Sequence, residues 1–408
     1  MPVNPMDERV FLIDIGVALI LAKILGYYSE RIRQPSVIGE ILAGILIGRF
    51  FLGYFFDEII SMPELYPFNF TSEDFVDVAH LGIIFLLFIA GMETDIEQVR
   101  STGKVAIFST IGGVLVPLIL GFTAGKLLAY SDKESLVIGV ILTATSIGIT
   151  ARTMMDLGIM QSKVGIISMS SSIIDDIIGL ILIVLVTGSG TIQGLALNIF
   201  VFFFAVAFGF RIIQRVMNLG ERVRTVKAIV SIALGVCFLY SALAEYTISA
   251  AIEGAYFAGL MISTTVQSRR IIDDIKSIGY SVFIPLFFVY IGTIVNLGVF
   301  LEKDVIILSF VLLVVAIVGK VLGRGVGAVI AGFGKWESFQ LGIGSIPRME
   351  VALVSMTIAI RVGAIASDHA DMFIAATVVF VTVTTLVTPP LIKWAFKEEI
   401  DASHLTPV

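Results

Sequence analysis

Thirteen long apolar runs dominate this sequence of 408 residues. Most approach the roughly 20 residues that a helix needs to cross the hydrocarbon core of a bilayer. A lone segment inside lipid satisfies its backbone hydrogen bonds only as a helix. The pattern therefore predicts an all-α membrane protein with thirteen transmembrane helices. The runs cover residues 10–28, 35–55, 75–92, 104–129, 135–154, 164–187, 191–213, 226–244, 248–265, 278–298, 304–332, 336–360 and 371–396.

The composition excludes other classes of protein. Hydrophobic residues make up 57% and charged residues 15% of the chain, against about 45–50% and about 25% in soluble domains. A soluble enzyme and a disordered chain are therefore both excluded. The net charge of −6 provides no basic surface for nucleic acid. One cysteine and three histidines far apart in sequence indicate neither a disulfide framework nor a Cys/His metal site, and no cofactor is expected.

Basic residues alternate between the two sets of connections. Connections after odd-numbered runs hold 17 lysines and arginines, whereas those after even-numbered runs, with the N-terminus, hold 6. Basic residues concentrate on the cytoplasmic side of membrane proteins. This distribution places the N-terminus outside and the C-terminus inside, which agrees with an odd number of crossings.

Charged residues lie in the middle of three runs. The sixth run contains Asp175 and Asp176, the eleventh contains Lys320, and the twelfth contains Arg348 and Glu350. Each costs at least about 2.5–3.5 kcal/mol in a membrane helix, so such residues mark functional positions. The two aspartates lie about 17 Å along their helix, near the bilayer midplane, and point about 100° apart. We expect one carboxylate to line a cavity and the other to face a neighbouring helix.

The same charges also have structural interpretations. A buried carboxylate can hydrogen-bond a neighbouring helix, and Lys320 can belong to an ion pair that only steadies two helices. Arg348 and Glu350 are assigned a structural role. Glu253 lies about one turn from the outer end of the ninth run, so we assign it to the rim of an outer cavity rather than to an ion site.

Two runs contain residues that weaken a helix in mid-membrane. The fifth gathers hydroxyl side chains around Gly148, including Thr145 and Ser146, and the twelfth contains Pro347. Interrupted helices at corresponding places in two halves are typical of transporters built from inverted repeats. The ion site of such a transporter lies between the ends of its half-helices.

The two predicted repeats are runs 4–6 and runs 11–13. An odd number of crossings separates their starting points, so the two triplets insert with opposite topology. The exposed ends of half-helices carry partial charge. Arg348 and Glu350, together with Arg152 near the end of the fifth run, are expected to neutralise these ends.

Six motifs together give this sequence a specific resemblance. They are QPSVIGEILAGILIG, FLLFIAGMETD, ATSIGITAR, SIIDDIIGL, GKVLG and PRMEV. With them the chain resembles the cation:proton antiporter superfamily, in the branch of bacterial and archaeal sodium/proton antiporters of the NapA and NhaA type, an inverted-repeat fold. The resemblance covers nearly the whole chain. It implies exchange of sodium, and of lithium, for protons across the cell membrane of a bacterium or archaeon.

The resemblance also implies a homodimer with moving parts. Its expected divisions are a dimerisation domain at 1–103 and 226–300, a mobile ion-transport core at 104–190 and 304–396, a linking helix and basic loop at 191–225, and a short cytoplasmic tail at 397–408.

The resemblance assigns roles to individual residues as well. Asp176 is the principal carrier of cation and proton, with Asp175 as a second sodium ligand that pairs with Lys320. Thr145 and Ser146 lie beside the site on the unwound crossing. Apart from the resemblance, Lys320 is expected to couple a further proton to transport, because a lysine desolvated at mid-membrane prefers its neutral form unless it is paired.

Three features depart from the pattern of related proteins. Met349 stands where similar proteins often have Gly, and Glu253 stands at a usually apolar position. The chain ends shortly after the thirteenth run, so we expect no nucleotide-binding regulatory domain of the kind found in glutathione-gated potassium-efflux relatives. The Asp-Asp pair favours electrogenic exchange over the electroneutral exchange of relatives with Asn-Asp.

Two other functions were weighed. An intramembrane aspartyl protease also has two membrane aspartates, but it needs them on different helices across a gap, whereas these two are neighbours on one helix. A potassium/proton exchanger, a potassium-efflux transporter or a channel is the nearer alternative. Carboxylate and hydroxyl oxygens coordinate Na⁺, Li⁺ and K⁺ alike, so the residues leave the cation open.

Overall fold

The computed structural model describes residues 8–56, 68–187, 191–223, 225–295 and 303–405, and these residues contain helices but no strand. The all-α prediction is therefore confirmed. In this described part of the chain, ten helices are long and apolar enough to cross a membrane. Within the described residues the elements are α1 (Glu8–Arg31), α2 (Ser36–Ile47), η1 (Arg49–Gly53), α3 (Glu73–Glu93), α4 (Ile96–Leu127), α5 (Asp132–Ile141), α6 (Ile147–Asp156), α7 (Lys163–Thr187), α8 (Ile192–Arg222), α9 (Ala228–Ile248), α10 (Ala251–Ser263), α11 (Ser268–Ile278), η4 (Gly279–Phe283), α12 (Ile284–Thr293), α13 (Lys303–Ile330), α14 (Lys335–Ile343), α15 (Glu350–Arg361), α16 (Ala370–Ala395) and α17 (Lys397–Leu405).

Three of the predicted runs form shorter helices. The run at 248–265 forms α10, which is apolar but has only 13 residues. The run at 135–154 is split into α5 and α6, and the run at 336–360 is split into α14 and α15. The chain leaves the helical conformation at residues 142–146 and 344–349, where the Thr145–Ser146 pair and Pro347 lie.

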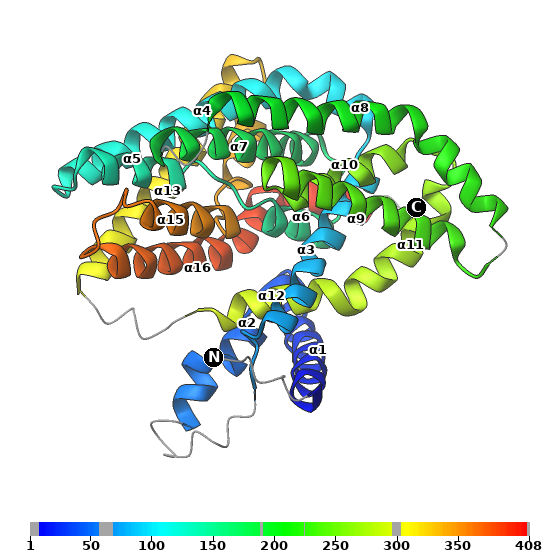
Figure 1. The fold of residues 1–408 in the computed structure, drawn as a ribbon, viewed down its shortest axis with the longest axis horizontal. Coiled ribbons are helices and arrows are strands. Elements are labelled where there is room, and N and C mark those ends of the chain that lie inside the picture. Colours follow the sequence, from blue (N-terminus) through cyan, green and yellow to red (C-terminus); the bar gives the residue numbers. More distant parts are fainter. Residues whose placement is uncertain (1–7, 57–67, 188–190, 224, 296–302, 406–408) are drawn as a thin grey trace. The chain divides into compact units, whose positions relative to one another are not determined.

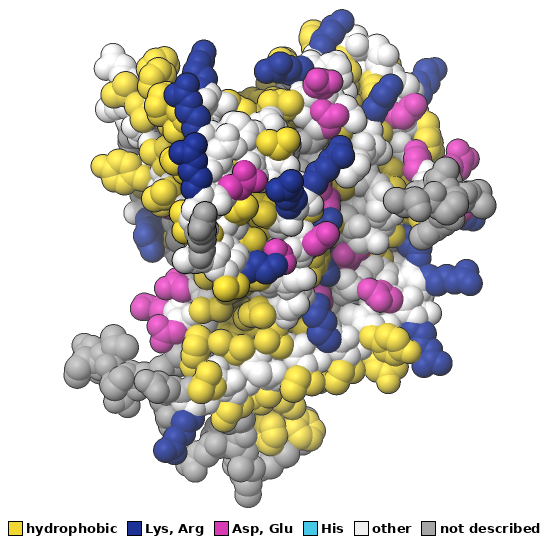
Figure 2. Space-filling model, turned by 90° about the vertical axis from the view of Figure 1, so that its right-hand side faces the viewer, with side chains coloured by type: hydrophobic (Ala, Val, Ile, Leu, Met, Phe, Trp, Pro, Cys, Tyr) yellow, Lys and Arg dark blue, Asp and Glu magenta, His cyan; other side chains and the backbone are white. Residues whose placement is uncertain are grey.

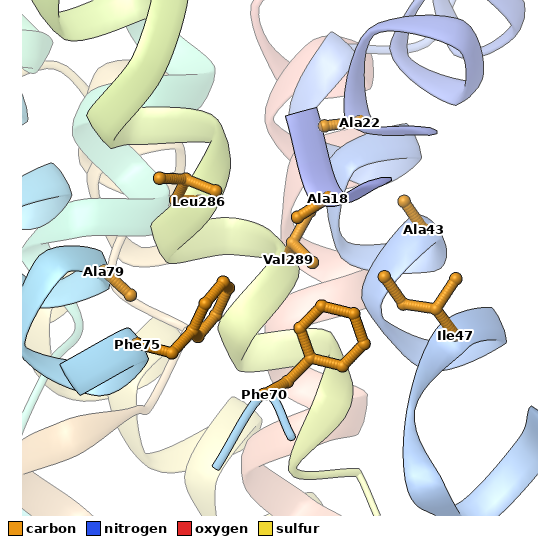
Figure 3. Packing of buried hydrophobic residues seen from close by; sticks show 9 residues of the cluster. All are labelled: Ala18, Ala22, Ala43, Ile47, Phe70, Phe75, Ala79, Leu286 and Val289. Carbon is orange, nitrogen blue, oxygen red and sulfur yellow. The ribbon is translucent and has the colours of Figure 1, made fainter. Parts of the chain in front are cut away.

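The chain divides into two compact units, one formed by residues 1–86 and 273–299 and the other by residues 87–272 and 300–408. The core of the first unit joins α1, α2, α3 and α12 (Figure 3). Its buried residues are Ala18, Ala22, Ala43, Ile47, Phe70, Phe75, Ala79, Leu286 and Val289. The small residues let backbones approach closely. At Gly44 and Gly292 a β-carbon would collide with the backbone of the facing helix, so α2 and α12 require glycine there.

In the second unit, α4 lies alongside α13, α5 and α7 (Figure 1). α4 and α13 approach each other closely at Gly112 and Gly323, where a β-carbon on either residue would meet the other's backbone. α13 in turn packs against α14 and α16, and α9 packs against α8 and α10. This packing brings α7 and α13, which carry the predicted charged residues, into one compact unit.

The surface carries many large apolar side chains. Leu12, Phe200, Phe204, Leu239 and Phe310 are each exposed, as are many others on the long helices. On the face shown in Figure 2, hydrophobic side chains lie beside lysine, arginine and acidic side chains. Exposed apolar area on this scale is expected of helices that face lipid rather than water.

Candidate functional site

The two mid-membrane aspartates lie side by side on α7 but have different surroundings. Asp175 is fully buried, and Asp176 is 9% exposed. Because neighbouring residues of a helix point about 100° apart, their carboxylates reach different helices. Asp175 faces α13, whereas Asp176 contacts α10.

One oxygen of Asp175 accepts hydrogen bonds from three residues. Lys320 Nζ donates at 2.6 Å and Thr145 Oγ1 at 2.9 Å, and the guanidinium group of Arg324 forms an ion pair with the same oxygen. Lys320 and Arg324 are four residues apart, so they lie on one face of α13. Asp175 therefore joins α7 both to α13 and to the link between α5 and α6.

Sequence reasoning assigned no role to Arg324, yet this side chain is as deeply buried as Lys320. Besides Asp175, it donates to the hydroxyl groups of Ser171 and Ser172, which lie one turn earlier on α7. The signal for it is present in GKVLGRG, where a second basic residue follows Lys320 by one helical turn. Arg324 makes Asp175 the partner of two cations.

Asp176 has an acidic partner. Its side chain lies within interaction distance of the carboxyl group of Glu253, which is in the first turn of α10 and is 4% exposed. Two ionised carboxylates repel and neither can donate a hydrogen bond, so a proton or a cation between these two groups would stabilise them. Sequence reasoning had not paired Glu253 with Asp176.

The two interrupted segments meet at their breaks. The backbone N–H of Ser146 donates to the carbonyl of Pro347 at 2.8 Å. The hydroxyl of Thr150 donates to the carbonyl of Gly344 at 2.6 Å. Backbone groups that the breaks free from helical hydrogen bonds are thus partly satisfied by the opposite segment, as membrane burial demands.

Arg348 lies at the ends of two half-helices. Its guanidinium group donates to the carbonyls of Ser345 and Ile346, both at 2.8 Å, beyond the end of α14. The same group donates to the carbonyl of Leu142, the residue that ends α5, at 3.1 Å. Arg348 also interacts electrostatically with both Asp175 and Asp176. One buried cation therefore faces the negative ends of α5 and α14 together.

The other predicted charges lie elsewhere. Arg152 is buried in α6 and forms an ion pair with Asp156, one turn further along, at 3.1 Å. Glu350 is the first residue of α15, and its side chain is outside the part of the structure that is described.

Buried oxygen atoms near the crossing lack hydrogen-bond donors. Within the described residues, Ser146 Oγ and Asp175 Oδ1 have no hydrogen-bond partner. Buried polar atoms of this kind are usually satisfied by water or an ion. No group of three His, Cys, Asp or Glu side chains in the described part of the chain is arranged to hold a metal ion. Carboxylate and hydroxyl oxygens such as these can coordinate a monovalent cation.

Comparison with known proteins identifies the family to which the chain belongs. The family model described as "Sodium/hydrogen exchanger, transmembrane" matches residues 16–398. The chain belongs to the sodium/hydrogen exchanger family. The exchanger is thus a membrane transporter that exchanges a monovalent cation for protons, and the intramembrane protease is ruled out.

Several relatives match the exchanger over nearly their whole length. The Na(+)/H(+)-K(+) antiporter GerN of Bacillus cereus is 31% identical over 95% of this chain and 97% of its own. The Na(+)/H(+) antiporter of Enterococcus hirae is 30% identical over 95% of this chain and 98% of its own. Among solved structures, the sodium proton antiporter MjNhaP1 of Methanocaldococcus jannaschii has a TM-score of 0.65 with 18% identity, covering 97% of this chain and 98% of that one. That structure shows that the exchanger has an antiporter fold.

Proposed function

We propose that the exchanger carries sodium, with lithium as a second substrate, in exchange for protons at Asp176. The observation that supports this assignment is a buried carboxylate beside two crossing half-helices, with Arg348 close enough to interact with it electrostatically. Burial favours the protonated form of a carboxyl group. A cation and a proton can therefore compete for Asp176, and each can be carried across in turn.

Lys320 makes the exchange electrogenic in this proposal. In the ion-free state it pairs with Asp175 at 2.6 Å. A cation that binds at Asp176, the neighbour of Asp175, weakens this pair and allows Lys320 to release a proton, because a buried lysine without a partner favours its neutral form. More than one proton then moves for each cation. Membrane potential contributes about 2.3 kcal/mol per charge per 100 mV to such a cycle.

The proposed architecture is that of an inverted-repeat transporter in the cell membrane of a bacterium or archaeon. It has thirteen crossings, with the N-terminus outside and the C-terminus inside. This number is supported by ten long apolar helices, α10 and two interrupted segments among the described residues. Two copies pair through the scaffold at 1–103 and 226–300, and the core at 104–190 and 304–396 moves against it to give alternating access.

Potassium is the second candidate cation. The observation that favours it is the name of GerN, which includes both Na(+) and K(+). Hydroxyl and carboxylate oxygens such as those of Ser146 and Asp176 do not by themselves select an ion by size.

The deciding experiment is proton-coupled fluorescence in vesicles that contain the purified exchanger. Addition of Na⁺, Li⁺ or K⁺ outside acid-loaded vesicles is followed as dequenching of a pH-sensitive dye. We expect responses to sodium and lithium. A response to potassium alone would replace the sodium proposal by the potassium one, and no response to any of the three would contradict both.

A further inference from the structure

We propose that Glu253, rather than Asp175, is the second carboxylate ligand of the transported cation. The cation then binds between Asp176 on α7 and Glu253 on α10. This inference rests on the proposed exchange at Asp176. It adds a residue that sets both the affinity of the site and its selectivity among monovalent cations.

The first support is the contact between the two carboxyl groups. The carboxyl groups of Asp176 and Glu253 lie within interaction distance of each other, and both are buried. A pair of acidic groups gains nothing from burial unless a proton or a cation lies between them, because two ionised carboxylates repel. The pair therefore has the chemistry of a site that binds a proton or a cation.

The second support is that Asp175 is already neutralised. Its Oδ2 atom accepts from Lys320, Arg324 and Thr145. One negative charge thus faces two positive ones, and the surroundings of Asp175 repel a further cation. Although Asp175 Oδ1 has no hydrogen-bond partner among the described residues, a cation placed there would face Lys320 and Arg324. Around Asp176 the charges differ: two carboxyl groups, those of Asp176 and Glu253, face one cation, Arg348, which also interacts with Asp175. The two acids together therefore favour a cation more than Asp175 does.

The exchange at this pair is balanced in charge. With one shared proton, the two carboxyl groups carry a net charge of −1. When a monovalent cation enters, that proton leaves, both groups are ionised, and the net charge is again −1. Cation and proton are therefore alternative occupants of one site, which is what an antiporter requires.

Glu253→Gln in the full-length exchanger, reconstituted in vesicles at one fixed pH, tests the proposal. The amide keeps the shape of the side chain but loses the negative charge. We expect the apparent KM for sodium to rise about tenfold, which corresponds to a loss of about 1.4 kcal/mol in binding. The sodium concentration that half-maximally raises the melting temperature of the detergent-purified protein should rise by a similar factor.

Glu245→Gln is the matched control. Glu245 is an exposed acid close enough to interact electrostatically with Glu253, and its oxygen accepts from the N–H of Ala251, which an amide oxygen also can. We expect both sodium readouts to stay at the parent values in this variant. Parent values in Glu253→Gln, or an equal change in both variants, would overturn the proposal.

Glu253→Asp covers the case in which Glu253→Gln fails to purify as a monodisperse protein. Aspartate keeps the negative charge but is shorter by one methylene group. If residue 253 binds the cation, this change in distance should alter the ratio of the KM values for Li⁺, Na⁺ and K⁺. Unchanged ratios would refute the assignment. A parent protein without any cation-dependent proton movement would instead refute the proposed function, so the two failures are distinguishable.

Discussion

At the scale of single residues, the two neighbouring carboxylates of the site have different partners and therefore different chemistry. Asp175 is held by Lys320 and Arg324, whereas Asp176 faces another acid, Glu253. The separation follows from helix geometry, since residues one apart point about 100° from each other. Each aspartate can therefore be tested alone, although both lie on α7.

Asp176→Asn should reduce cation-driven proton movement to the background of empty vesicles. Asparagine cannot bind and release a proton in this way, and it holds a cation with one neutral oxygen only. The variant should still fold, because an amide can hydrogen-bond Glu253. Dye dequenching measures the exchange, with Asp132→Asn as a control, since the Asp132 side chain is 80% exposed and lies on a helix end. Near-parent exchange in Asp176→Asn would show that another group carries the ions.

Lys320→Gln should retain part of the exchange but lose its electrogenic current. Asp175 keeps Arg324 as a partner in this variant, so the buried carboxylate is not left without a counter-charge. The proton that Lys320 would release is missing, so less net charge moves for each cation. Current on a solid-supported membrane measures this, with Lys303→Gln at the exposed start of α13 as the control. If the current per sodium in Lys320→Gln equals that of the parent, Lys320 carries no proton.

At the scale of elements, the two broken helices stabilise each other at their breaks. A half-helix that ends inside a membrane leaves carbonyl groups without donors, which costs several kcal/mol unless they are satisfied. Here the Arg348 guanidinium group supplies donors to both α5 and α14. Ser146 and Pro347 add a direct backbone hydrogen bond between the two segments.

Arg348→Met should therefore destabilise the fold by about 3 kcal/mol or more, because each hydrogen bond to a charged group contributes about 1.5–3 kcal/mol. The melting temperature in detergent should fall by several degrees. The melting temperature of Arg348→Lys should lie between those of the parent and of Arg348→Met. A lysine ammonium group lacks the planar fork of donors with which arginine reaches both helix ends. A matched control is Arg361→Met, at the exposed end of α15. If Arg348→Met and the parent had the same melting temperature, Arg348 would not stabilise the two helix ends.

At the scale of the whole molecule, the proposed transport cycle depends on which helices move together. The proposed core includes α7, and the proposed scaffold includes α2 and α10. A cation held between Asp176 and Glu253 would then bind to both parts at once. Occupancy of the site would in this way be linked to movement of the core, as alternating access requires.

Cysteine crosslinking tests this division. Cys237 is the only cysteine, so a Cys237→Ala background permits pairs introduced at chosen positions. A covalent link between the proposed core and the proposed scaffold should stop exchange, because it prevents the two parts from moving against each other. A link between two protomers through the segment 226–300 should leave exchange unchanged. Reduction of the disulfide serves as the control for each pair, and the reverse pattern would show that the moving helices are assigned wrongly.

The sequence by itself determined the class of the protein, most helix positions and the residues worth testing. Apolar runs long enough to span a bilayer leave little choice but helices, and charges within them are too costly to be incidental. Thr145–Ser146 and Pro347 also marked the two interruptions, because local backbone preferences act over a few residues.

Tertiary structure alone decided which of these residues meet. In the sequence, Arg324 is marked only by its position one helical turn after Lys320. Its role becomes visible in the structure, where it contacts Asp175 of α7. Glu253 and Asp176 lie 77 residues apart in the sequence and on different helices, yet they are neighbours in the structure. Hydrophobicity fixes how deep a residue lies in a membrane but not the direction in which its helix faces. That direction depends on packing at small residues such as Gly112 and Gly323, where only the assembled helices show the contact.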